Sequence, residues 1–161
     1  MKIAIIFSSK HGTTAKVAQQ LGEKLGEEIT LINLKDQKKP KIDMFDAYIL
    51  GTAIYAGNPI KSIKNFSLKN KDLLINKPLG LFICGMDPGT EKQQEEMKAA
   101  FPIELLEHAK SKYYLGGEFI FEDMNFMERF IIKNISKIGK SISLIHHENI
   151  QKFAAEFKEE K

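Results

Sequence analysis

The sequence predicts an α/β fold in which a doubly wound parallel sheet of five strands, in the order 2-1-3-4-5, is covered by helices on both faces. Three observations favour this fold. Short apolar runs that suit strands buried on both faces recur along the chain. Apolar residues at helical spacing follow several of these runs. The length of 161 residues suits a substantial core, so we expect residues 1–161 to form one domain of three layers.

The first strand, turn and helix are expected at the start of the chain. Residues 3–7 are all apolar and predict a buried strand. Residues 8–14, which come next, are rich in hydroxyl groups and contain a single glycine. Apolar positions at helical spacing then predict a helix that ends at Gly26. These positions are Ala15, Val17, Ala18, Leu21 and Leu25.

The middle of the chain repeats this alternation of strands and helices. Residues 29–34 are more polar and predict an edge or near-edge strand. Residues 47–51 predict the third strand, and Pro59 suits the first position of the helix that follows. Residues 79–85 are apolar almost throughout and predict a central fourth strand.

The second half of the chain completes the predicted sheet. Charged and apolar residues at helical spacing predict helices at residues 91–100 and 103–109. Residues 112–119 predict the fifth strand, and the double glycine at 116–117 is expected to bend it near its end. A last helix is predicted at residues 149–158, with its apolar face toward the core.

The turn between the first strand and the first helix predicts a phosphate site. Four hydroxyl groups and the free N–H groups of a helix N-terminus would point at one small volume. The turn consists of Ser8, Ser9, Lys10, His11, Gly12, Thr13 and Thr14. Because Gly12 is its single glycine, the turn is neither a Walker loop nor a dinucleotide fingerprint. The alternative is an ordinary helix N-cap made by Ser9 or Thr13.

Two further loops follow predicted strands, at the edge where open α/β sheets bind ligands. The first contains Thr52, Ala53, Ile54, Tyr55, Ala56 and Gly57, and the second contains Cys84, Gly85, Met86 and Asp87. Tyr55 either stacks on a flat ring or packs onto the following helix. Cys84 is expected to be a buried and unreactive thiol, and we assign no catalytic residue.

Residues 7–14, Phe-Ser-Ser-Lys-His-Gly-Thr-Thr, resemble the phosphate loop of flavodoxins. The resemblance implies FMN, held non-covalently by its 5′-phosphate at residues 8–14. It also implies that the loops at 52–57 and 84–87 cover the two faces of the isoalloxazine ring. Flavodoxins often place a tyrosine in the second loop, where this chain has Met86.

Four stretches together resemble the menaquinone-dependent protoporphyrinogen oxidase family, a flavodoxin-like branch. They are residues 7–14, 51–57, 116–117 and 127–133. This resemblance implies oxidation of a porphyrinogen in heme biosynthesis, with a quinone as acceptor. The chain departs from that family after the fourth strand. Characterised members are rich in arginine and lysine there, whereas this chain has Glu91, Glu95 and Glu96.

Two classes of function follow from these observations. The first is an FMN-binding redox protein that transfers electrons to a partner protein or oxidises a small substrate with a quinone acceptor. The second is a non-redox binding module with the same fold, which the missing aromatic residue after Gly85 favours. The sequence leaves the oligomeric state open.

Composition excludes several other classes. The net charge of +3 is too balanced to indicate nucleic-acid binding. The single cysteine excludes an intramolecular disulfide, and His146-His147 lacks a third ligand, so no metal site is expected. No signal peptide or spanning segment is recognisable, so we expect a cytoplasmic protein. A basic amphipathic helix, expected between Phe126 and Lys140, either covers the sheet or touches the inner face of a membrane.

Overall fold

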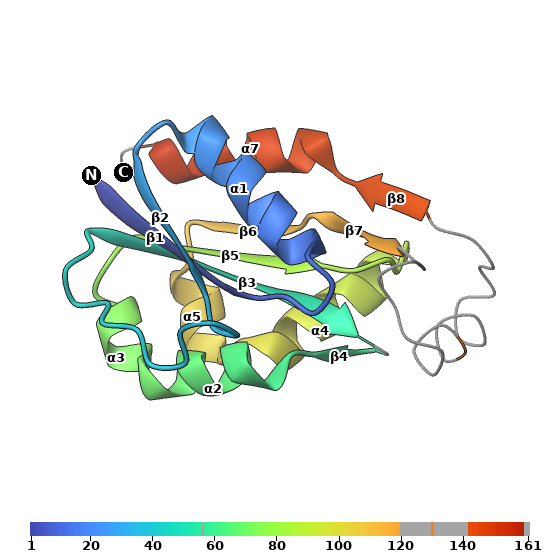
Figure 1. Ribbon diagram of the computed structural model, residues 1–161, viewed down its shortest axis with the longest axis horizontal. Coiled ribbons are helices and arrows are strands. Elements are labelled where there is room, and N and C mark those ends of the chain that lie inside the picture. The colour runs from blue at the N-terminus through green and yellow to red at the C-terminus, as the bar shows by residue number, and fades with distance from the viewer. Residues whose placement is uncertain (56, 120–129, 131–141, 160–161) are drawn as a thin grey trace.

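The computed structural model describes residues 1–55, 57–119, 130 and 142–159 (Figure 1). Five parallel strands form the central sheet in the order β2-β1-β3-β5-β6. Their bounds are β1 Lys2–Ser8, β2 Glu28–Asn33, β3 Ala47–Tyr55, β5 Leu79–Cys84 and β6 Ser111–Tyr114. Counted along the chain, these parallel strands have the order 2-1-3-4-5, so the predicted fold class and strand order are confirmed.

Helices cover both faces of this sheet and produce three layers (Figure 1). One face carries α1 (Thr13–Leu25) and α7 (His147–Lys158). The other carries α2 Lys61–Lys69, α3 Lys71–Leu74, α4 Thr90–Ala100 and α5 Ile103–His108. Alternate residues of β1 divide the core accordingly. Ile3 and Ile5 pack in the cluster beneath α1 and α7, whereas Ala4 and Ile6 belong to the cluster on the opposite face.

Close packing between the central strands explains one of the core glycines. Gly51 on β3 pairs with Phe82 on β5, and the Phe82 ring occupies the space beside it. A Cβ atom at Gly51 would lie 2.0 Å from Cζ of Phe82. Gly51 therefore lets the Phe82 ring lie over β3, within the core cluster beneath α1 and α7.

The third strand is longer than predicted, and the helix after it begins later. β3 extends to Tyr55 and pairs antiparallel with β4 (Asn58–Pro59), so residues 52–55 belong to a strand rather than a loop. Pro59 is not the first helical residue, because it lies in β4 and the helix starts at Lys61. A proline is tolerated in so short an edge strand because it has no N–H group to leave unpaired.

The predicted fifth strand is divided in two. β6 ends at Tyr114, and β7 (Gly116–Phe119) leaves the main sheet to pair antiparallel with β8 (Ile142–Ile145). Gly116 has a φ of 79°, a conformation that side chains disfavour, and it turns the chain between the two strands. The sequence predicted a bend here, but neither the separate two-stranded sheet nor β8.

The helix expected between residues 126 and 140 lies outside the described residues, apart from Phe130. The Phe130 side chain is exposed. Among the helices that the structure describes, none combines the length and apolar character needed to cross a membrane.

Candidate functional site

The carboxyl ends of β1, β3 and β5 meet the beginning of α1 around a small cavity of about 60 Å³. All three predicted segments contribute to it, together with β7. Its lining consists of Ser9, Lys10, His11, Thr13, Thr14, Ala53, Ile54, Tyr55, Cys84, Gly85, Met86, Gly117 and Glu118. The predicted residues Ser8, Gly12, Thr52, Gly57 and Asp87 are outside this lining, and Ala56 is outside the described residues.

The turn after β1 leaves the N-terminus of α1 without a side-chain cap. Gly12 occupies the N-cap position, and no described side chain hydrogen-bonds to the free amides there. The Ser9 hydroxyl is used within the turn, where it accepts the N–H of Gly12 at 3.1 Å. Neither Ser9 nor Thr13 therefore acts as the helix cap. The positive end of the helix dipole is available to an anion.

Thr14 carries a buried hydroxyl group whose hydrogen bonding is unsatisfied. Its side chain is fully buried, and Oγ1 has no hydrogen-bond partner of standard geometry among the described residues; the Cys84 thiol, which lies close to it, is only a weak partner. A buried polar group without a partner is unfavourable, and such groups often mark ligand sites. Cys84 is its neighbour. Burial raises the pKa of the Cys84 thiol to about 12, and the Thr14 hydroxyl offsets this only in part.

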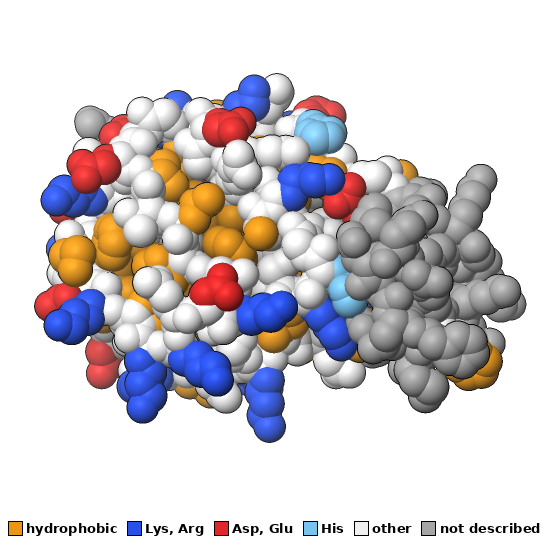
Figure 2. Space-filling model, viewed as in Figure 1, with side chains coloured by type: hydrophobic (Ala, Val, Ile, Leu, Met, Phe, Trp, Pro, Cys, Tyr) orange, Lys and Arg blue, Asp and Glu red, His pale blue; other side chains and the backbone are white. Residues whose placement is uncertain are grey.

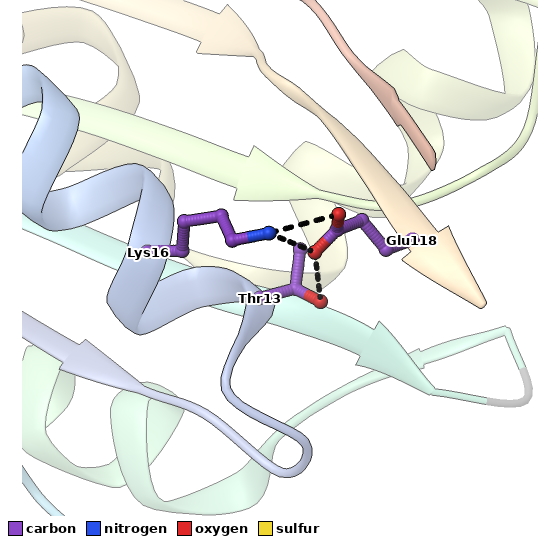
Figure 3. Close-up of polar contacts among 3 residues, drawn as sticks. All are labelled: Thr13, Lys16 and Glu118. Carbon is purple, nitrogen blue, oxygen red and sulfur yellow. Dashed lines mark hydrogen bonds and ion pairs between the residues drawn. The ribbon is translucent and has the colours of Figure 1, made fainter. Parts of the chain in front are cut away.

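A carboxylate that the sequence analysis missed lies against the same turn (Figure 3). Glu118 on β7 accepts a hydrogen bond from the Thr13 hydroxyl at 3.3 Å. Lys16 Nζ contacts both carboxylate oxygens, at 3.2 and 3.1 Å. The Glu118 side chain is only 6% exposed. Its position close to the turn depends on the pairing of β7 with β8, which no local pattern indicated.

Glu118 is held in its ionised form. Burial raises the pKa of its carboxyl group, but hydrogen bonds from Ser143, Lys16 and Thr13 and the charge of Lys16 outweigh this effect. The pKa is therefore lowered overall. An internal anion thus occupies one side of the hydroxyl turn, and any anionic ligand would meet its negative charge.

Tyr55, the last residue of β3, packs against the turn after β1. Lys10 Nζ lies 3.6 Å from the centroid of the Tyr55 ring, a cation–π contact. The His11 and Tyr55 ring centroids are 6.3 Å apart, with an angle of 53° between the rings. These contacts join the end of β3 to the turn and place an aromatic side chain in the wall of the cavity.

Tyr114, a second residue that the sequence analysis did not assign to the site, positions the loop after β5. The backbone N–H of Asp87 donates to the Tyr114 hydroxyl at 3.1 Å. A Cβ atom at Gly85 would lie 2.1 Å from that hydroxyl, so glycine is required for the approach. Burial raises the pKa of Tyr114, which keeps the hydroxyl neutral. Met86, next to this contact, lines the cavity.

Ser8 and Thr52 use their hydroxyls to fix the protein's own structure. The Ser8 and Ser62 hydroxyl oxygens are 2.5 Å apart, which joins the end of β1 to α2. The backbone N–H of Ile60 donates to Thr52 Oγ1 at 3.2 Å. Within the part of the chain that the structure describes, no group of three or more His, Cys, Asp or Glu side chains could hold a metal ion.

Comparisons with known proteins agree with this fold. The flavodoxin domain family model matches residues 4–144. Flavodoxin 1 from Bacillus cereus has 19% identity and a TM-score of 0.59, with 98% of this chain and 97% of that chain covered. A short-chain flavodoxin associated with a non-canonical PDU bacterial microcompartment has 14% identity and a TM-score of 0.61, with 98% of this chain and 96% of that chain covered.

A flavodoxin from Fusobacterium nucleatum, solved with flavin mononucleotide bound, has 16% identity and a TM-score of 0.54, covering 98% of this chain and 96% of that chain. A search among curated proteins finds no significant match. At these identities the solved structures support the fold, and the family model covers most of the sequence. The chain therefore belongs to the flavodoxin domain family.

Proposed function

We propose that this protein binds FMN non-covalently and acts as a redox protein, in electron transfer or as a flavin-dependent oxidoreductase. The observation that carries this proposal is the unsatisfied Thr14 hydroxyl beside the uncapped N-terminus of α1. A phosphate monoester would supply the acceptor that this hydroxyl lacks and the negative charge that the helix N-terminus favours. The Fusobacterium nucleatum flavodoxin is a relative solved with this cofactor.

The residues around the cavity suit the two parts of FMN. The hydroxyls of Thr13 and Thr14 and the first amides of α1 would hold the phosphate. Tyr55, at the end of β3, and Met86, in the loop after β5, would contact the two faces of the ring. The cavity of about 60 Å³ is far below the roughly 300–1,000 Å³ of ordinary ligand sites, so binding requires these loops to separate.

Binding of the phosphate requires the Glu118 carboxylate to move. Its carboxylate shares the Thr13 hydroxyl with the expected phosphate position, and two anions cannot share one donor at low cost. Entry of the phosphate is therefore expected to break the contact between Glu118 and Thr13. Lys16 can keep its ion pair with Glu118 or turn toward the phosphate.

The protein's own contribution is binding, orientation and exclusion of water. Bound FMN would supply the electron or hydride chemistry. The Cys84 thiol has a pKa of about 12, so it stays protonated and takes no part as a nucleophile. Tyr114 holds the Met86 loop through Asp87, which sets how closely that loop approaches a ring.

A narrower proposal is the oxidation of protoporphyrinogen with a quinone acceptor. Its support is the sequence resemblance described above. The helix after β5 argues for other substrates, because α4 exposes Glu91 and Glu95, which would repel the carboxylates of a porphyrinogen. Electron transfer or oxidation of a less acidic substrate is therefore favoured. Turnover of protoporphyrinogen with menaquinone by the FMN-loaded protein would restore the oxidase proposal.

The first experiment measures FMN binding in the full-length protein. We expect flavin absorption bands to persist after gel filtration and to bleach with dithionite. Reductive titration without oxygen, followed by absorbance, then separates one-electron from two-electron reduction. Protein that stays colourless and takes up no added FMN would contradict the proposal and favour the non-redox binding module.

A further inference from the structure

A second and much larger cavity lies beside the turn, on the side of α2. It is a groove open to solvent, with a volume of about 970 Å³, and it is bordered by the turn, the loop after β2, and α2. We call it the lysine groove. Its lining consists of Ser8, Ser9, Lys10, His11, Leu34, Lys35, Lys38, Lys39, Pro40, Ile60, Ser62, Asn65, Phe66, Lys69 and Asn70.

The charge of this groove is one-sided. Lys35, Lys38, Lys39 and Lys69 are exposed, and none forms an ion pair with another described residue. No aspartate or glutamate is among the described residues that line the groove. Figure 2 shows lysine side chains in the lower half of the same face, over α2 and the loop after β2, with an acidic side chain in the same region. Such a field attracts a ligand with several negative charges.

The floor of the groove is apolar. Leu34 and Phe66 are largely buried beneath it, and Pro40 and Ile60 are partly buried beside them. A small inorganic anion would leave these side chains without a partner. The floor therefore suits a ligand that combines its charge with a flat apolar body.

Polar groups lie at both ends of that floor. The amide side chain of Asn70 donates to the Phe66 carbonyl at 3.0 Å, which leaves its oxygen as an acceptor. At the other end, the contact between the Ser8 and Ser62 hydroxyls joins the turn to the first residues of α2. No described side chain caps α2, so its first amides add to the positive charge there.

We propose that the lysine groove binds a nucleotide with two or three phosphates. The phosphates lie among the lysines, and the base lies on the apolar floor, within reach of the asparagine amides. Lysine binds phosphate as a point charge. Pro40 and Ile60, the partly exposed apolar residues of the floor, would pack against the base. This site is distinct from the flavin cavity, although Ser9, Lys10 and His11 border both.

The test is calorimetric titration of the full-length protein with ADP, compared with adenosine and with inorganic pyrophosphate. We expect saturable binding of ADP, at least tenfold weaker binding of pyrophosphate, and no measurable binding of adenosine. The double variant Lys38→Gln/Lys39→Gln should weaken ADP binding more than tenfold. Both lysines are exposed, so the change leaves folding intact.

The matched control is Lys61→Gln/Lys64→Gln. These lysines are exposed on α2 but do not line the groove, and their removal changes the net charge equally. We expect ADP binding within twofold of the unmodified protein. Equal losses of ADP affinity in the two double variants would overturn the proposal, because binding would then depend on the overall positive charge and not on the lysines of the groove. Absent ADP binding, or pyrophosphate binding as tight as ADP, would overturn it too.

A third variant separates this proposal from the flavin site. Thr14→Val should weaken FMN binding and leave ADP binding unchanged, because Thr14 lines only the flavin cavity. Lys38→Gln/Lys39→Gln should weaken ADP binding and leave FMN binding unchanged. Parallel loss of both ligands in either variant would show one shared site and refute a separate nucleotide groove.

Discussion

Thr14→Val separates the stability of this protein from its proposed ligand binding. Valine has nearly the shape of threonine and lacks the hydroxyl group. The Thr14 hydroxyl is fully buried, and within the described part of the chain only the weak Cys84 thiol lies close to it, so its removal relieves most of a desolvation penalty of roughly 1–3 kcal/mol. We expect the ligand-free protein to unfold at a temperature higher by roughly 3–9 °C, at about 3 °C per kcal/mol for this size.

The same substitution should weaken FMN binding. A hydroxyl that donates to a phosphate contributes about 1.5–3 kcal/mol, which corresponds to a loss of affinity of roughly tenfold to a hundredfold. Circular dichroism during heating measures stability, and quenching of free flavin fluorescence measures affinity. Thr14→Ser retains the hydroxyl and serves as the control, with affinity expected close to that of the unmodified protein.

Thr13→Val provides the opposite case. Its hydroxyl already donates to the ionised Glu118 carboxylate, so removal should lower the stability of the ligand-free protein by about 1.5–3 kcal/mol. FMN affinity should again fall. The reasoning is refuted if Thr14→Val is less stable than the unmodified protein, or if it binds FMN equally well.

Three further substitutions test the packing and the charge at the site. Gly51→Ala should destabilise the protein by about 3 kcal/mol or more in urea unfolding, because its Cβ would overlap Phe82; a smaller change would show that the ring can move aside. Gly116→Ala meets a positive φ and a contact of 2.0 Å with the Leu144 carbonyl, so amide exchange in β7 and β8 should become faster, and unaltered exchange would contradict this. Glu118→Gln should be less stable at pH 7. Since the pKa of Glu118 is lowered by folding, its contribution is present above the unfolded pKa of about 4.3 and is lost as pH falls through the folded pKa, so a deficit that does not shrink as pH is lowered below about 4.3 would refute the charge argument.

The sequence was sufficient for the five parallel strands of the sheet, though not for their ends, because local patterns indicate where such strands lie. The apolar runs at 3–7 and 79–85 identify buried parallel strands, and the helices between them require crossovers of one hand. The turn at 8–14 was located for the same reason, since its hydroxyls stand between a strand and a helix. The structure brings this turn and both predicted loops around one cavity. Their role in FMN binding stays a prediction.

The missed features depend on pairings that are distant or very short. Glu118 reaches the turn because β7 leaves the sheet and pairs with β8, more than 20 residues later in the chain. Tyr114 on β6 supports the Met86 loop, which follows the neighbouring strand β5. The position of Tyr114 in a predicted strand could not reveal this contact. Pro59 carries a helix-start signal, yet its pairing with Ile54 in a two-residue strand prevailed.

On the proposed function, the ion pair between Lys16 and Glu118 also limits which anions bind at the turn. In the free protein a tethered carboxylate competes for the Thr13 hydroxyl, at an effective concentration that a dissolved ion does not reach. Orthophosphate makes only charged and hydrogen-bonding contacts, so it is expected to compete poorly with the Glu118 carboxylate for the Thr13 hydroxyl. A ligand that displaces Glu118 must therefore add contacts beyond those of its phosphate, and on the proposed function this requirement selects FMN over a free inorganic anion.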